Sequence, residues 1–163
     1  MLSKYLLWIF IVVFFSCSAD LDNCKQVHFT PSLIHVDSET SFSYDIDKTY
    51  IVQYLSYDCT SCIKQISSWQ EIIAKFNIRS KVNIVIVGDG DLVRIQHVLD
   101  KLNFDDITVL YDFQGSFLVE NQIIKMYEEH CFILNKGITI CSKLPFSNKD
   151  DERNFIDNVN SLK

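Results

Sequence analysis

The sequence predicts an α/β fold, a three-layer sandwich in which flanking helices cover a central mixed sheet. Two observations carry this prediction. From residue 50 onward, short β-rich or apolar runs alternate with amphipathic helical patterns, and the alternation ends in a hairpin and a last helix. The 163 residues are 48% hydrophobic and include only four glycines and two prolines, which supports one core and excludes a disordered or fibrous chain.

The first half of this pattern contains two strands and two helices. Residues 50–55 form a short β-rich run, and residues 63–76 carry apolar side chains at helical spacing. Residues 82–87 are almost continuously apolar, which is typical of a central strand covered on both faces. Asp91 can then cap a helix predicted at residues 92–102.

The second half predicts one more parallel strand, a short helix, a hairpin and a terminal helix. These elements are expected at residues 107–111, 117–124, 131–134 with 138–141, and 150–162. The hairpin is expected to turn at residues 135–137. Residues 27–44 are expected to add a small N-terminal strand or hairpin.

The N-terminus has the pattern of an export signal. Residues 5–15 are eleven apolar residues in a row, too few to span a bilayer as a helix, and they follow a single Lys. Ser16 and Cys17 end this run and resemble a bacterial lipoprotein signal, in which the cysteine is lipidated and becomes the first residue. A plain secretory peptide cut near Ala19, or an uncleaved anchor, is the alternative.

The lipoprotein interpretation divides the chain into three parts. Residues 1–16 are then a signal peptide, residues 17–26 the lipidated cysteine and a polar tether, and residues 27–163 the folded domain. It also implies a location in the bacterial cell envelope, with the domain facing the periplasm and the membrane contacted through the N-terminal lipid.

The charge balance is acidic, with 15 Lys and Arg against 21 Asp and Glu and a net charge of −6. No two basic residues are adjacent in the sequence. This pattern argues against a nucleic-acid partner, and it means that acyl chains rather than basic residues would hold the protein to a membrane.

Cys59 and Cys62 lie where the strand at residues 50–55 gives way to a helix. The free N–H groups at a helix N-terminus favour a thiolate at Cys59, and the thiolate is the nucleophile in disulfide exchange. Cys62, one turn further along, is placed to attack the mixed disulfide that Cys59 forms. A structural disulfide and a zinc site are the alternatives, although zinc would need a second CxxC or a His pair, and the sequence has neither.

Three segments resemble the thioredoxin-like superfamily, and within it the exported thiol–disulfide oxidoreductases of the TlpA and ResA type. They are residues 54–62 (YLSYDCTSC), 108–112 (TVLYD) and 132–137 (FILNKG), and the match covers about residues 48–163. The resemblance implies a thioredoxin-like sandwich with Cys59 as nucleophile and Cys62 as resolving thiol. It further implies no bound cofactor, protein or small-molecule disulfides as substrates, and an electron donor in the membrane.

The chain departs from the family pattern at three places. Asp58 stands where the family usually has Trp, and its negative charge would raise the pKa of Cys59. Gln53 stands where many thioredoxins carry a buried acid, and it can form hydrogen bonds but cannot titrate. The family's cis-proline would fall at Glu129 or His130, neither of which is proline, so a trans peptide is expected.

Two other functions stay open. The alignment places His130 opposite the CxxC, so Cys59, Cys62 and His130 together could bind copper or another metal. A redox-inactive domain that only binds a partner is the other alternative.

The remaining cysteines are ambiguous. A three-residue hairpin turn would put Cys131 opposite Cys141 and allow a cross-strand disulfide, whereas the alternative is two small buried hydrophobic residues. Cys24 has no evident partner in the sequence.

Overall fold

The computed structural model describes residues 26–38, 40–101, 106–123 and 130–162. The expected signal peptide, Cys17, most of the tether and Glu129 lie outside these residues. The strands are β1 (Leu33–His35), β2 (Tyr50–Ser56), β3 (Asn83–Asp89), β4 (Ile107–Asp112), β5 (His130–Asn135) and β6 (Ile138–Lys143). The helices are α1 (Thr60–Phe76), α2 (Leu92–Lys101), the short 3-10 helix η2 (Phe113–Gly115), α3 (Ser116–Glu120) and α4 (Lys149–Ser161).

The six strands form one mixed sheet in the order β1-β4-β3-β2-β5-β6. Strands β2, β3 and β4 are parallel, whereas β1, β5 and β6 pair in antiparallel fashion. The predicted α/β class, the parallel strands and the later hairpin are therefore confirmed. The predicted N-terminal hairpin is also present, because Ile34 in β1 forms an antiparallel bridge with Ser41.

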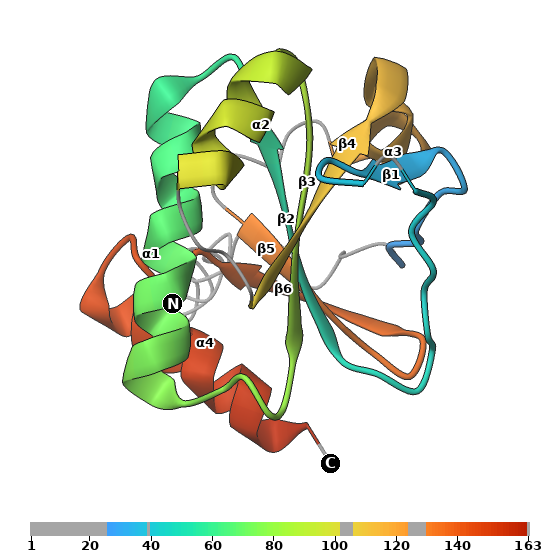
Figure 1. Cartoon of the computed structure of the whole chain (residues 1–163). Coiled ribbons are helices and arrows are strands. Elements are labelled where there is room, and N and C mark those ends of the chain that lie inside the picture. Colours follow the sequence, from blue (N-terminus) through green and yellow to red (C-terminus); the bar gives the residue numbers. More distant parts are fainter. Residues whose placement is uncertain (1–25, 39, 102–105, 124–129, 163) are drawn as a thin grey trace, which may run out of the picture.

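Helices α1, α2 and α4 cover one face of the sheet, and α3 with the N-terminal segment covers the other (Figure 1). The first layer contains the buried aromatic side chains Trp69 and Phe155, whose rings meet edge to face at 5.6 Å. In the second layer Phe29 packs against Phe42, Tyr44, Tyr50 and Phe117. Both faces of β2 and β3 are thus buried, as the apolar run at residues 82–87 predicts.

The helix α2 begins directly after its expected cap, Asp91. The Asp91 carboxylate accepts a hydrogen bond from the Arg94 N–H at 3.0 Å, as its predicted capping role requires. Asn148 caps α4 in the same way, through the N–H groups of Asp150 and Asp151. The helix expected at residues 117–124 is shorter and begins earlier, because the buried carboxylate of Asp112 accepts the Phe117 N–H.

The hairpin between β5 and β6 differs from the expected one by one residue. Its turn contains only Lys136 and Gly137, with φ of 48° and 80°, and Asn135 pairs directly with Ile138. Positive φ at both central residues is the geometry of a two-residue hairpin turn.

This register rules out the Cys131–Cys141 disulfide. Cys131 pairs with Ser142, and Phe132 pairs with Cys141, so the two cysteines project from opposite faces. Cys131 is a buried free thiol, and burial raises its pKa well above the ordinary value, whereas Cys141 is disulfide-bonded. Cys131 therefore fits the alternative of a small buried hydrophobic residue.

Gly88 lets β2 and β3 approach closely at the end of the sheet where α1 begins. A Cβ atom at this position would lie 2.3 Å from the Leu55 carbonyl oxygen and 2.7 Å from the Tyr57 ring. That ring is fully buried, and its hydroxyl donates to the Leu110 carbonyl at 2.6 Å. Only glycine leaves room for the Tyr57 ring at this point.

Replacing Gly88 by alanine should lower the free energy of unfolding by about 2–4 kcal/mol, because backbone atoms would have to move. The matched control is Gly137→Ala, where φ is +80° but no atom lies within 4 Å of the added Cβ. It should cost about 1 kcal/mol. Urea unfolding of both variants measures the difference, and equal losses would contradict the packing argument.

Candidate active site

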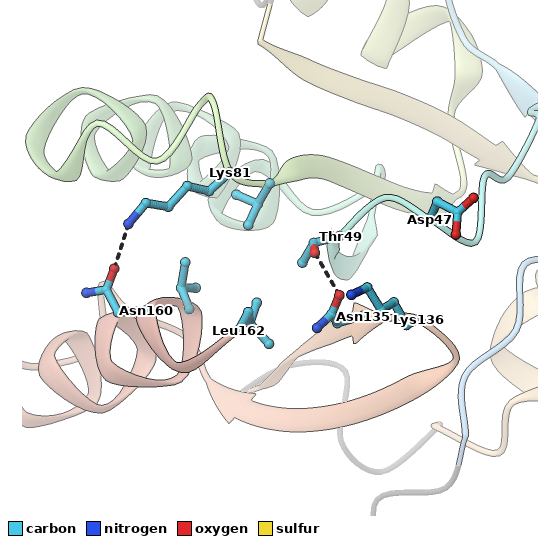
Figure 2. Close-up of a pocket in the computed structure, with 9 residues that line it drawn as sticks. Asp47, Thr49, Lys81, Asn135, Lys136, Asn160 and Leu162 are labelled. Atoms are coloured by element: carbon cyan, nitrogen blue, oxygen red, sulfur yellow. Dashed lines mark hydrogen bonds between the residues drawn. The ribbon is translucent and has the colours of Figure 1, made fainter.

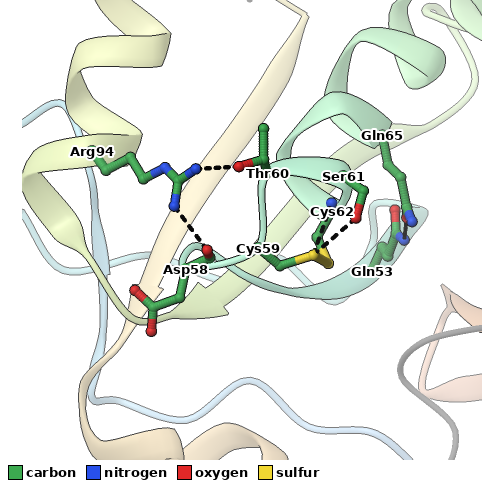
Figure 3. Close-up of a disulfide and its surroundings, with 8 residues drawn as sticks. All are labelled: Gln53, Asp58, Cys59, Thr60, Ser61, Cys62, Gln65 and Arg94. Carbon is green, nitrogen blue, oxygen red and sulfur yellow. Dashed lines mark hydrogen bonds between the residues drawn. A yellow bond between two sulfur atoms is a disulfide. The ribbon is translucent and has the colours of Figure 1, made fainter.

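Cys59 and Cys62 meet at the N-terminus of α1, where the parallel strand β2 ends. Cys59 is the N-cap residue, and its Sγ accepts a hydrogen bond from the Cys62 N–H at 3.2 Å. The two cysteines form a disulfide, with Cα atoms 5.2 Å apart (Figure 3). The Ser61 hydroxyl lies 3.1 Å from the same Cys59 sulfur.

This position gives Cys59 the surroundings of a reactive thiol. A sulfur at the N-cap receives a backbone N–H and lies at the positive end of the helix dipole, and both effects favour the thiolate. Cys59 and Cys62 are half-buried, while Thr60 and Ser61 between them are exposed. The motif can therefore be reached by another protein or a small disulfide.

The loop before Cys59 is held against the end of β3. The Tyr57 N–H donates to the Asp89 carbonyl at 2.7 Å, and the Asp91 N–H donates to the Asp58 carboxylate at 3.0 Å. Gly90, with φ of +106°, lies directly beneath Asp58, and a Cβ there would lie 2.9 Å from the carboxyl carbon. The exposed Asp58 side chain is thus fixed beside the motif, as the sequence suggested.

Arg94 is a site residue that sequence reasoning did not identify. Its Nη1 donates to the Asp58 carbonyl at 2.7 Å, and its Nη2 donates to the Thr60 hydroxyl. Nothing in the sequence distinguishes Arg94 from the other basic residues on helix surfaces. Only the packing of α2 beside α1 brings it to the cysteines.

Gln53 is completely buried beneath α1 and bonds to two residues of that helix. Its amide nitrogen donates to Gln65 at 2.5 Å, and its amide oxygen accepts the Trp69 indole N–H at 2.6 Å. The amide joins β2 to α1 without carrying a charge. A neutral donor and acceptor at this place makes the network independent of pH.

Asp89 belongs to a second polar group at the same end of the sheet. Burial raises the pKa of its carboxyl, and the negative charges of Asp112 and Asp58 raise it further, while a hydrogen bond from Tyr54 opposes them. Burial also raises the pKa of the Tyr54 phenol well above its usual range. Asp112 is fully buried and accepts the N–H of Phe117, so it stabilises the turn into α3.

His130 is the first residue of β5 and is half-buried. Since β5 runs antiparallel to β2, this residue lies at the end of the sheet where α1 begins. No group of three or more His, Cys, Asp or Glu side chains in the described part of the chain could hold a metal ion. The alternative ligand set of Cys59, Cys62 and His130 is therefore not assembled here.

The peptides of the described residues are all trans. Glu129, one of the two positions expected to replace the cis-proline, lies outside the described residues.

A cavity of about 310 Å³ opens at the other end of the sheet, before β2 and β3 begin (Figure 2). It is bordered by polar side chains such as Lys81, which donates to Asn160 at 2.9 Å, and Asn135, which accepts from Thr49 at 3.1 Å. None of its lining residues is a cysteine. The cavity and the Cys59–Cys62 pair therefore lie at opposite ends of the sheet.

No protein-family model matches the sequence, and no curated protein is similar to it in sequence. Solved structures of thioredoxin-like thiol–disulfide oxidoreductases, in contrast, resemble the fold. A secreted disulfide oxidoreductase of Mycobacterium tuberculosis, described as homologous to DsbE of E. coli, has a TM-score of 0.58 and 16% identity, covering 79% of this chain and 93% of that one. A thiol–disulfide oxidoreductase of Bacteroides fragilis has a TM-score of 0.62 and 10% identity, covering 83% and 99%.

The exposed lipoprotein thioredoxin of Streptococcus pneumoniae is a third similar structure, with a TM-score of 0.57, 17% identity, and coverage of 80% of this chain and 97% of that one. These comparisons establish the thioredoxin-like fold that the resemblance implied. In the described part of the chain, no helix has the length and apolar character to cross a membrane.

Replacing Asp58 by asparagine should lower the pKa of Cys59 by about half a unit, because a nearby exposed negative charge is removed. Asparagine keeps the oxygen that accepts the Asp91 N–H, so the loop should stay in place. The pH dependence of Cys59 alkylation by iodoacetamide, resolved by mass spectrometry, gives this pKa.

The matched control is Asp100→Asn, which removes a carboxylate from an exposed position near the other end of α2. It should leave the pKa of Cys59 unchanged. An equal pKa in Asp58→Asn and the wild type would show that Asp58 does not act on the thiolate.

Proposed function

We propose that this chain is a thiol–disulfide oxidoreductase that reduces disulfides outside the cytoplasm and is held to a membrane by a lipid on Cys17. The observation that carries the activity is the Cys59 sulfur, which accepts the Cys62 N–H at the α1 N-terminus and is disulfide-bonded to Cys62. The same pair can exist as a dithiol, and the exposed residues between the cysteines leave it open to a substrate.

Reduction of a substrate proceeds by two exchanges. The Cys59 thiolate attacks one sulfur of the substrate disulfide, a mixed disulfide forms, and the other substrate sulfur leaves as a thiolate that takes up a proton. Cys62, after losing its proton, attacks the Cys59 sulfur and releases the second substrate thiol. The products are two substrate thiols and the Cys59–Cys62 disulfide, so two electrons have passed from the protein to the substrate.

A second dithiol must then return the protein to its reduced state by the reverse exchange. We infer a membrane partner for this step, because the proposed location separates the domain from cytoplasmic reductants. The helix N-terminus that favours the Cys59 thiolate makes Cys59 the first nucleophile.

The location rests on the N-terminal sequence and on the neighbours. Residues 1–16 are a signal peptide, Cys17 carries the lipid, residues 17–26 form the tether, and residues 27–163 are the catalytic domain in the periplasm. The similar structures include a secreted oxidoreductase and an exposed lipoprotein, which supports this arrangement.

The activity is tested by insulin reduction with dithiothreitol as the electron source. Cys59→Ser should lower the rate by more than about a hundredfold, because the attacking sulfur is lost. Cys62→Ser should also lower turnover but should accumulate a mixed disulfide through Cys59, visible by non-reducing electrophoresis. The control is Cys131→Ala, a change at the buried free thiol, and it should keep wild-type turnover. Full turnover by Cys59→Ser would refute the proposal.

The anchor is tested by labelling with an alkyne fatty acid in a bacterial host. The wild type should incorporate the label, and Cys17→Ala should incorporate none because the acceptor thiol is gone. Cys24→Ala removes a cysteine seven residues further along and should be labelled like the wild type. Label on Cys17→Ala would contradict lipidation at this position.

A further inference from the structure

Arg94 reaches from α2 across to the loop that carries Cys59. Its guanidinium donates to the Asp58 carbonyl at 2.7 Å on one side of Cys59 and to the Thr60 hydroxyl on the other (Figure 3). The side chain therefore spans the residues directly before and after the nucleophile. The Asp91 carboxylate fixes the backbone of Arg94 by accepting its N–H at 3.0 Å.

Neutral acceptors hold the guanidinium, so its charge is not neutralised by a salt bridge. The Asp58 carboxylate points away from Arg94 and binds the Asp91 N–H instead (Figure 3). Among the ion pairs of the described residues, none involves Arg94. A guanidinium stays protonated at any pH at which the protein works, so this positive charge is permanent.

The other charged and titratable groups on the elements around Cys59 are mostly acidic. Those at the end of the sheet where α1 begins are Asp58 in the loop, Asp89 at the end of β3, Asp91 before α2, Lys64 on α1 and His130 on β5. Negative charge near a thiol opposes ionisation, whereas a nearby cation favours it. Arg94 adds a positive charge to this set and bonds to both residues that flank the nucleophile.

We propose that Arg94 is a positioning residue for dithiol–disulfide exchange. The two hydrogen bonds of its guanidinium hold residues 58–60 so that Cys59 stays at the α1 N-terminus, and its positive charge stabilises the Cys59 thiolate. This inference deepens the proposed function and rests on it. On reduction the pair takes up two electrons and one proton, leaving a thiolate at Cys59 and a thiol at Cys62. The new negative charge forms on Cys59, the residue between the two that Arg94 binds, Asp58 and Thr60.

The test measures the pKa of Cys59 in the reduced full chain, kept in mild detergent. Iodoacetamide alkylation is followed from pH 4 to 10, and fragmentation of the peptide containing residues 49–64 separates Cys59 from Cys62. Arg94→Met should raise the midpoint by about one unit, which is about a tenfold lower alkylation rate below both midpoints. Arg94→Lys keeps the positive charge but cannot make both hydrogen bonds of the guanidinium, so its midpoint should lie between those of Arg94→Met and the wild type.

The matched control is Arg153→Met, which removes one positive charge from an exposed position on α4. It should leave the midpoint unchanged. An Arg94→Met midpoint equal to the wild type would overturn the proposal. An Arg94→Lys midpoint equal to that of Arg94→Met would do so as well, because the charge would then not act on Cys59.

The reduction potential supplies a second readout that a purely structural role would not move. A tenfold weaker thiolate makes the disulfide more stable, and for a two-electron couple a tenfold change in the equilibrium constant is about 30 mV. Arg94→Met should therefore have a potential about 30 mV more negative than the wild type, measured against glutathione or dithiothreitol buffers at a pH above both midpoints.

The two proposals fail in different ways. If wild-type protein reduces no insulin yet Arg94→Met shifts the Cys59 midpoint, the oxidoreductase function is wrong, and only the effect of Arg94 on the Cys59 thiolate stands. If wild-type protein reduces insulin and the midpoints are equal, the function stands and the role of Arg94 is wrong.

Discussion

The hydrogen bond from the Tyr57 N–H to the Asp89 carbonyl sets the point at which the chain leaves the sheet, and the site depends on that point. β2 and β3 approach closely there because Gly88 has no side chain to oppose the Tyr57 ring. Tyr57 and Asp58 are then held at the end of β3, which fixes Cys59 as the N-cap residue of α1. The positions of both cysteines relative to the helix dipole follow from this single junction.

The arrangement of the sheet could be predicted because its signals are local. An apolar run at residues 82–87 is long enough to indicate a strand buried on both faces, and the capping role of Asp91 follows from its place before an amphipathic pattern. The hairpin register could not be predicted. The register depends on whether Lys136 adopts positive φ beside Gly137. A shift of one residue in the pairing of β5 and β6 changes whether Cys131 and Cys141 lie on the same face of the sheet.

The site also contains residues that the sequence predicts and residues that it does not. The cysteine pair could be found because a strand, a CxxC and a helix follow one another in the sequence. Arg94 could not, because it is 35 residues from Cys59 and reaches the motif only through the packing of α2. The role of Gln53 could be predicted only in part. The sequence indicates a residue that cannot titrate, whereas its partners Gln65 and Trp69 are identified only once α1 packs on the sheet.

The partners of Gln53 limit which groups can change the stability of the Cys59 thiolate. Because the buried Gln53 is a neutral amide hydrogen-bonded to Gln65 and Trp69, it has no acidic proton to supply when the disulfide opens. In the described chain, the guanidinium of Arg94 on α2 bonds to the motif at the exposed Thr60. The charge that favours or opposes the Cys59 thiolate is thus set at the surface, where salt and a docking substrate can also act on it.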